Sequence, residues 1–240
     1  MTTELPQIFV LHVREGYEDR AAHIDSMMAR LGLPFEYILD GDKADLTPEI
    51  LEHWFAGPMK CVQGATSCAF KHLIACQKIV SQGLSGALVL EDDIVLSPRH
   101  EEVTKHTVAE LPAAEPAIIS YEETRLRYVP RSRRRKGQYL YTGDRDRFAG
   151  AIYINAAGAR VILEEAEKNG LDCPIDIFHR RLLAQGCLKY YWSHPCTAVQ
   201  GSFNGLFRTG FDARRSTNSS AKAMIWKAKR LYRKLLYFFR

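Results

Sequence analysis

The feature that most constrains the fold is an uninterrupted apolar run, Ala87 to Leu90, followed at once by Glu91, Asp92 and Asp93. The run lacks the polar alternation of a half-exposed strand, so it predicts a strand buried on both faces of a parallel sheet. Three adjacent carboxylates at its end repel one another and lose hydration, and a hard divalent cation would compensate them. In open α/β sheets, ligands bind outside the carboxyl ends of the strands, and these three acids would lie there. A solvated acidic turn is the alternative.

Apolar runs and helical patterns alternate over the first 200 residues. A strand at 7–13, a helix at 19–31 that ends at Gly32, and a strand at 35–39 form a β-α-β unit, which implies a right-handed crossover and a parallel sheet. Thr47 and Pro48 predict a helix start. Further strands are predicted at 117–121, 139–141, 151–154 and, as the last, 188–192; further helices at 66–82, 98–109, 155–168 with Asn155 as cap, and 174–186.

These patterns predict one α/β domain over residues 1–210, followed by a linker and helix over 211–240. The start of the chain, Met1 to Pro6, lacks the basic and apolar segments of a secretory signal, and no stretch approaches the roughly 20 apolar residues that cross a bilayer. The six cysteines have no CxxC or other zinc spacing. A cytoplasmic protein with reduced cysteines is therefore expected.

Charge is divided unevenly along the chain. The net charge of +5 combines a balance of −11 over residues 1–123 with one of +16 over residues 124–240. Within the second half, seven basic residues fall in the twelve positions 125–136, including Arg133, Arg134 and Arg135. The basic half predicts contact with an anionic partner. The 125–136 segment is either a solvated, mobile loop or an anion-binding lid on the acceptor side of an active site.

The last twenty residues, 221–240, contain no acid, glycine or proline. At helical spacing the apolar residues share one face and the basic residues the other, which is typical of a helix at a membrane interface. Packing of the apolar face on the protein itself or on a second copy is the alternative. The residues predicted to contact an anionic membrane are Lys227, Arg230, Leu231, Arg233, Lys234, Leu235 and Phe238.

Four blocks resemble glycosyltransferase family 25, which includes bacterial lipooligosaccharide glycosyltransferases and collagen galactosyltransferases. They are the first strand with Arg14 and Arg20, the segment Gly64 to His72, the block Leu88 to Ile94, and the region from Ala151 to Asp176. The chain departs from the family pattern at His12, Ser67 and Lys71.

The resemblance implies a single GT-A-like, Rossmann-like nucleotide-sugar-binding domain with a mostly parallel sheet. It implies an inverting enzyme that moves a hexose, with galactose favoured, from a UDP-sugar to a lipid-linked glycan of the lipooligosaccharide or lipopolysaccharide type. Such an enzyme would work at the inner face of the cytoplasmic membrane. Asp93 is the expected metal ligand, for Mn²⁺ or Mg²⁺, with Glu91 in support. Donor-binding roles are expected for Arg14, Arg20, His72, Glu91 and Asp92.

Transfer also requires a base that removes the proton of the acceptor hydroxyl. Asp176 is the candidate, and its alternative role is a carboxylate that interacts favourably with the dipole of a helix N-terminus. His194 is a candidate third metal ligand, with a hydrogen-bonded structural histidine as the alternative. The rival function is a non-catalytic basic module for anionic membrane or nucleic acid. Nucleic acid is not the expected partner, because the aromatic residues near the arginines lack the arrangement of a base-stacking platform.

Overall fold

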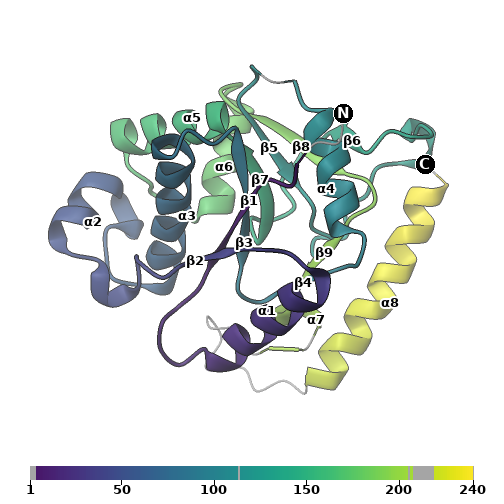
Figure 1. Ribbon diagram of the computed structural model, residues 1–240, viewed down its shortest axis with the longest axis horizontal. Coiled ribbons are helices and arrows are strands. Elements are labelled where there is room, and N and C mark those ends of the chain that lie inside the picture. Colours follow the sequence, from purple (N-terminus) through teal and green to yellow (C-terminus); the bar gives the residue numbers. More distant parts are fainter. Residues whose placement is uncertain (1–3, 113, 205, 208–218, 240) are drawn as a thin grey trace.

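The apolar runs form one seven-stranded sheet in the computed structural model, which describes residues 4–112, 114–204, 206–207 and 219–239 (Figure 1). Its strands are β1 Gln7–Leu11, β2 Glu36–Ile38, β3 Gly86–Glu91, β5 Ala117–Ser120, β6 Leu140–Thr142, β7 Ala151–Asn155 and β8 Lys189–Ser193. Their order is β2-β1-β3-β7-β5-β8-β6. Five strands share one direction, and β6 and β7 run against them. The predicted α/β fold with a mostly parallel sheet is confirmed.

Helices cover both faces of this sheet. On one face lie α2 Pro48–Trp54, α3 Gly64–Ser81, α5 Ala156–Asn169 and α6 Ile175–Ala184, and on the other α1 Glu18–Leu31 and α4 His100–Ala109 (Figure 1). Successive side chains of β3 alternate between the two cores: Val89 packs in the first and Leu88 in the second. Because both faces are buried, the strand contains no polar residue before Glu91, as its sequence predicted.

Local signals set the helix ends as expected. Gly32 closes α1 at φ 65°, and its N–H donates to the carbonyls of Ala29 and Met28. Thr47 caps α2, since its Oγ1 accepts from the Ile50 N–H at 3.4 Å. Asn155 caps α5 in the same way, with Oδ1 at 2.8 Å from the Gly158 N–H. Short 3₁₀ helices, η1 Lys43–Asp45, η2 Gly57–Met59 and η3 Arg131–Arg133, occur in the connections.

A second, two-stranded sheet joins β4 Ile94–Leu96 to β9 Ala198–Gln200 in antiparallel pairing, and α7 Gly201–Asn204 follows it. The strand predicted at 188–192 is present as β8, but it is not the last strand, because β9 follows it. Three-residue strands are too short to show a period, and this pair joins segments about a hundred residues apart. The small sheet matters for the site, because it brings the segment 200–202 against the acidic block.

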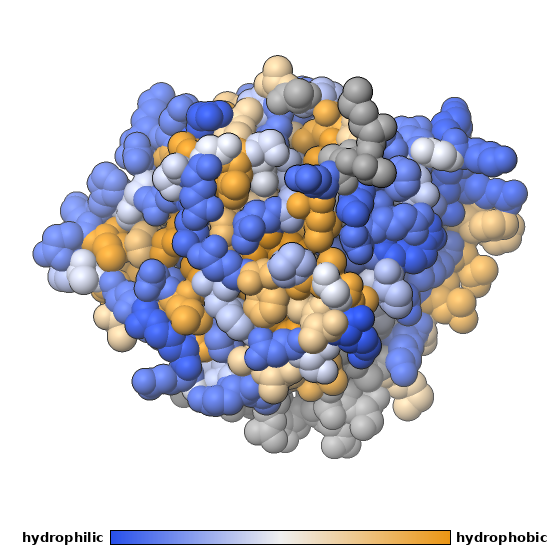
Figure 2. All heavy atoms as spheres, in the orientation of Figure 1, coloured by the Kyte–Doolittle hydropathy of each residue, from blue (hydrophilic) through white to orange (hydrophobic). Residues whose placement is uncertain are grey.

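The last helix, α8 Ser219–Phe238, runs along the outside of the molecule and is yellow in Figure 1. The proposed boundary at 210–211 and the linker before α8 lie outside the described residues. Among the described helices, none has the length and apolarity needed to cross a bilayer. The apolar side chains of α8 and of the residue after it stay at the surface (Figure 2). Their exposed fractions lie between 38% and 83%, and they are Met224, Ile225, Leu231, Tyr232, Leu235, Leu236, Phe238 and Phe239.

Candidate active site

The acidic block lies in the turn between β3 and β4, at the carboxyl end of the central strand β3. The backbone of α7 closes over it: the Gly201 N–H donates to the Asp93 carbonyl at 2.6 Å, and the Ser202 N–H donates to Asp93 Oδ2 at 3.3 Å. The carboxyl ends of β1, β5 and β8 meet at the same edge of the sheet, because these strands run parallel to β3. Their following loops therefore supply the neighbours of the three acids.

The middle acid, Asp92, is already compensated by the protein. Arg20 Nη1 of α1 lies 2.7 Å from Asp92 Oδ1, and His12 Nδ1 lies 2.8 Å from Oδ2. All three side chains are mostly buried. The protein itself therefore supplies part of the positive charge that the acidic block was expected to need. The donor-binding roles expected of Arg20 and Asp92 stay predictions.

The outer acids have a different environment. Asp93 is only 5% exposed, and its Oδ1 has no hydrogen-bond partner among the described residues. Burial, with the nearby charge of Glu91, raises the pKa of Asp93 to about 6. Glu91 Oε2 accepts a hydrogen bond from Gln200 Nε2 at 3.1 Å. No protein cation pairs closely with Asp93 in the described part of the chain, so this carboxylate fits the role of a cation ligand.

A fourth carboxylate, Glu122, belongs to the site and was not singled out from the sequence. It follows β5 and is fully buried; its Oε1 accepts from the N–H groups of Gly150, at 2.6 Å, and Ala151, at 3.2 Å. Its Oε2 has no partner among the described residues. Burial and the charge of Glu91 raise the pKa of Glu122 well above its usual range. The available signal was its position one residue beyond a predicted buried strand, Ala117 to Tyr121.

Carboxylate oxygens are the ligands that a hard divalent cation prefers, and Asp93 Oδ1 and Glu122 Oε2 are both buried and unpartnered in the described chain. The possible ligand atoms that lie within 4.8 Å of one another among the described residues are Cys68 Sγ, a His72 ring nitrogen and a Glu91 carboxylate oxygen. His72 is 1% exposed, and neither ring nitrogen has a hydrogen-bond partner there. Sulfur and imidazole suit softer ions, so the carboxylate set is the better match to Mn²⁺ or Mg²⁺.

Asp176 lies in the first turn of α6, as predicted, and faces the same site. Its Oδ2 accepts from Arg125 Nη2 at 3.1 Å. Burial raises the pKa of Asp176, against the opposing effect of Arg125, and the charge of Glu91 is near enough to contribute. Arg125 also contacts Asp146 Oδ2 at 3.1 Å, so one guanidinium holds two carboxylates. A partly buried carboxylate with a raised pKa is suited to accept a proton.

The remaining predicted residues are more scattered. Arg14 pairs with Asp45 and lies within 3.7 Å of Asp42, beyond the ends of β1 and β2. Lys71, which departs from the family pattern, is buried and contacts Asp42 at 2.9 Å. These contacts order the loop after β2 beside the acidic block.

His194 lies beyond the end of β8, which β7 and β5 separate from β3. Its backbone N–H donates to the Tyr139 carbonyl at 2.8 Å, and the centre of its ring lies 6.2 Å from that of the Tyr141 ring. Burial, then the charge of Arg134, lowers the pKa of His194 to about 4. Neither neighbour is one of the acids 91–93, and the role of His194 as a metal ligand stays a prediction.

The predicted acceptor-side arginines lie at the end of η3 and directly after it, and each side chain donates to a backbone carbonyl. Arg133 Nη2 reaches the Thr142 carbonyl at 2.9 Å, Arg134 Nε that of Val129 at 2.9 Å, and Arg135 Nη1 that of Ser132 at 3.0 Å. The segment is therefore folded back on itself rather than extended over the acidic block.

All six cysteines of the chain are free, as expected of reduced cysteines.

Comparison with known proteins identifies a family that most of the chain matches. Residues 6–178 match the model of glycosyltransferase family 25, described as an LPS biosynthesis protein. No curated protein matches the chain. Among solved structures, a glycosyltransferase involved in the glycosylation of the major capsid of PBCV-1 is similar, with 10% identity, coverage of 93% of this chain and 100% of that one, and a TM-score of 0.42. A putative glucose-1-phosphate thymidylyltransferase from Bacillus anthracis, in complex with a sucrose, follows with 14% identity, coverage of 90% and 75%, and a TM-score of 0.37.

The family match spans well over half of the sequence and contains the acidic block, the Cys68–His72 segment and Asp176. It supports an enzyme over the non-catalytic basic module that the charge distribution left open. The chain therefore belongs to glycosyltransferase family 25.

Proposed function

We propose that this glycosyltransferase moves a hexose, with galactose favoured, from a UDP-sugar to a lipooligosaccharide-type glycan. The observation that carries the proposal is the convergence of Glu91, Asp93 and Asp176 at one edge of the sheet, close enough for the charge of Glu91 to act on both aspartates. The reaction needs two kinds of carboxylate, one group to bind the cation of the diphosphate and one to receive a proton. This edge offers both.

Glu91 and Asp93 would hold the divalent cation, Mn²⁺ or Mg²⁺, and Glu122 would add a further oxygen. When bound, the cation supplies positive charge for the departing diphosphate. The support lies in the buried oxygens of Asp93 and Glu122, which have no other partner among the described residues. His194 is not part of this proposal, because its contacts are on the opposite half of the sheet.

Asp176 would act as the base. It would accept the proton of the acceptor hydroxyl while the hydroxyl oxygen bonds to the anomeric carbon and the bond to the diphosphate breaks. A single displacement of this kind inverts the anomeric configuration. Support comes from the raised pKa of Asp176 and from Arg125, which orients its carboxylate at 3.1 Å. Arg14, at the end of β1, would contact the nucleotide.

A donor screen tests the proposal. Purified protein with Mn²⁺ is offered UDP-galactose, UDP-glucose and UDP-N-acetylhexosamines, and release of UDP is measured with and without a lipooligosaccharide extract. We expect acceptor-stimulated release, greatest with UDP-galactose, and none from the Asp93→Ala variant. Release from no nucleotide sugar, or equal release by the variant, would contradict the proposed donor and site.

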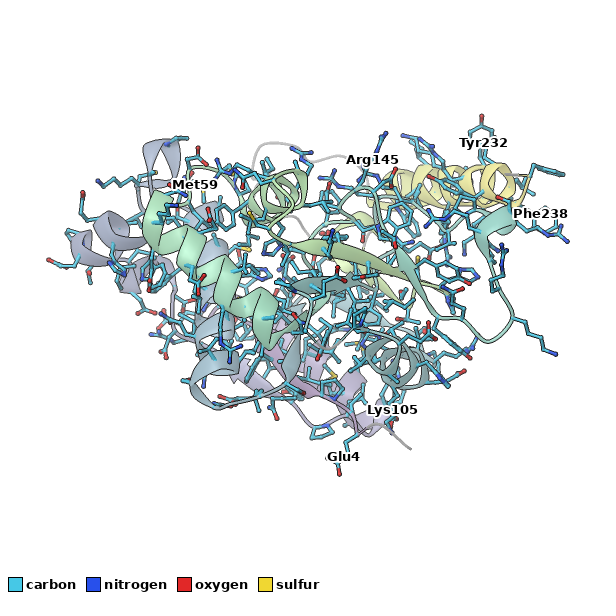
Figure 3. The ribbon with its side chains drawn as sticks, turned by 90° about the horizontal axis from the view of Figure 1, so that it is seen from above. Glu4, Met59, Lys105, Arg145, Tyr232 and Phe238 are labelled. Carbon is cyan, nitrogen blue, oxygen red and sulfur yellow. The ribbon has the colours of Figure 1, made fainter. Side chains whose placement is uncertain are left out.

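We also propose that α8 attaches the enzyme to the inner face of the cytoplasmic membrane. The support is its exposed apolar side, from which Tyr232 extends away from the rest of the chain (Figure 3). Arg230 and Lys234 are engaged with Glu123, which leaves Lys227 and Lys229 for anionic lipid. Two such residues contribute about 2 kcal/mol near an anionic leaflet, in addition to apolar insertion.

Flotation with vesicles containing phosphatidylglycerol tests this attachment. The double variant Leu231→Ser/Leu235→Ser removes apolar surface without touching the contacts of Glu123, and it should lose vesicle binding. Val62→Ser is the matched control, since Val62 is a similarly exposed apolar residue far from α8 in the sequence. Binding that survives the double substitution would assign the membrane contact to another surface, such as the basic segment 125–136.

A further inference from the structure

A cavity of about 580 Å³ lies between α8 and the loops that follow β5 and β6. The body of the enzyme provides most of its walls, and α8 provides Arg233 and Tyr237. Figure 3 shows the loop residue Arg145 on the same side of the molecule as α8. Glycosyl transfer requires a place for the acceptor, and the acidic block alone does not supply one.

Five arginines line this cavity: Arg125, Arg127, Arg133, Arg145 and Arg233. Three carboxylates pair with some of them, namely Asp144 with Arg145, Asp146 with Arg125 and Arg127, and Asp176 with Arg125. Among the described residues, about two positive charges are therefore left without a counter-charge. A phosphomonoester carries roughly −1.5 to −2 at neutral pH, and guanidinium groups bind its oxygens in pairs.

The other walls are aromatic. Tyr128, Trp192 and Tyr237 line the cavity together with Leu126 and Pro130. Flat apolar side chains around a few fixed polar groups are typical of a small-molecule site, and they suit the apolar faces of a sugar ring. Charge and shape together fit a sugar that bears a phosphate.

The cavity adjoins the proposed base. Arg125 lines it and donates to Asp176 at 3.1 Å, while its guanidinium carbon lies 3.9 Å from the centre of the Phe148 ring. A sugar anchored in the cavity would therefore have neighbouring sugars of the same glycan within reach of Asp176. An anion site far from the catalytic residues would not share a residue such as Arg125 with the proposed base.

Helix α8 is held in place by one buried acid. Glu123, 7% exposed, contacts Arg230 Nη2 at 2.7 Å and Lys234 Nζ at 2.8 Å. Tyr237, one turn further, packs edge-on against Tyr128 with ring centres 5.6 Å apart. These contacts hold the helix by its basic side, which explains why Arg233 and Tyr237 face the cavity while the apolar residues face outward.

We propose that this cavity is the acceptor subsite and that it binds a phosphate-bearing sugar of the acceptor glycan, with α8 as one wall. The inference rests on the proposed function. It assigns a binding role to Arg145 and Arg233, which the sequence patterns had not assigned to an acceptor. It retains Arg125, Arg127 and Arg133 of the segment 125–136.

Calorimetric titration with glucose 6-phosphate tests the inference, carried out with saturating UDP and Mn²⁺ so that the donor site is filled. We expect binding in the millimolar range, no binding of glucose, and a loss of about tenfold or more in affinity for Arg233→Gln. Lys229→Gln is the matched control, because it removes the same charge from α8 outside the cavity. Glu123→Gln should also weaken binding, since it releases α8.

No heat from glucose 6-phosphate up to about 10 mM, equal binding of glucose, or equal losses in the Arg233 and Lys229 variants would overturn the inference. So would an Arg233→Gln variant that loses affinity for phosphatidylglycerol vesicles but not for glucose 6-phosphate, since the cavity would then bind a lipid headgroup. UDP-induced thermal stabilisation is measured on the same samples. Its absence would count against the proposed function, whereas its presence without sugar-phosphate binding would count against the cavity alone.

Discussion

Glu122 and Glu123 are consecutive in the chain, yet their carboxylates bind different parts of the protein. Glu122 accepts from the Gly150 N–H at 2.6 Å beside the acidic block. Glu123 contacts Arg230 and thereby attaches α8. One step along the backbone after β5 thus connects the proposed cation site with the proposed acceptor wall.

This relationship separates the two sites experimentally. Glu122→Gln keeps the hydrogen-bond acceptor but removes a carboxylate oxygen near Glu91 and Asp93. It should raise by about 10–100-fold the Mn²⁺ concentration at which UDP stabilises the protein in a thermal shift assay, as changes around metal ligands commonly do. Glu123→Gln should leave that titration unchanged. Equal Mn²⁺ curves for wild type and Glu122→Gln would remove Glu122 from the cation site.

Asp93→Ala should abolish transfer while preserving the fold. Its carboxylate is buried beside Glu91 with one oxygen unpartnered, so the melting temperature of the metal-free protein should stay the same or rise. Excess chelator should have the same effect on transfer. Glu101→Ala, on the surface of α4, serves as the control. Full turnover by Asp93→Ala, or in chelator, would show that Asp93 and a cation are not required.

Asp176→Asn should lower the transfer rate by about 10²–10⁴-fold, the usual contribution of a general base. The amide oxygen can still accept from Arg125, so donor affinity should change little. Asp172→Asn is the control, since Asp172 lies just before α6 and pairs with Arg181 instead. A parallel loss of rate and donor affinity would indicate that Asp176 binds the donor or supports the fold.

Arg20→Ala tests the compensation of Asp92. Removing one partner of a buried ion pair leaves the other charge uncompensated, which costs about 3–5 kcal/mol of unfolding free energy. His12 remains at 2.8 Å and should limit the loss to the lower end. Urea unfolding measures it, and the double variant Arg20→Ala/Asp92→Asn should recover part of the stability. Unchanged stability in Arg20→Ala, with weakened UDP binding, would favour a donor-binding role for Arg20.

His100 should make the protein less stable in mild acid. It is fully buried, Nδ1 lies 2.8 Å from Thr197 Oγ1, and burial lowers the pKa of His100 to about 4. In the unfolded chain His100 therefore binds a proton below about pH 6.5, whereas in the folded chain it binds one only below about pH 4. Unfolding free energy should fall by up to about 1.4 kcal/mol per pH unit across that window.

The check is urea unfolding at several pH values between 7 and 4 with His100→Gln. The variant should be less stable at pH 7 but should lose less stability on acidification, because it cannot take up this proton. His106→Gln, an exposed residue of the same helix, should keep the slope of the wild type. A slope that is identical in wild type and His100→Gln would assign the acid sensitivity to other groups.

Much of the fold was predictable because its signals are local. The apolar run before Glu91 predicted a doubly buried strand, and Gly32, Thr47 and Asn155 predicted helix ends that the structure confirms. Strand β9 was not predictable in the same way. Three residues carry no measurable period, and their partner strand lies about a hundred residues earlier.

The candidate site divides in the same manner. The order of residue types along the chain determined the acidic block, the first-turn position of Asp176 and the two-sided character of α8, because each depends on spacing within one element. Only the tertiary structure decided that Asp92 pairs with Arg20, that Glu122 joins the acids and that α8 docks by its basic side. Those outcomes depend on which charged residues, far apart in the sequence, come together in a low-dielectric environment. The packing of strands and loops determines which charges meet.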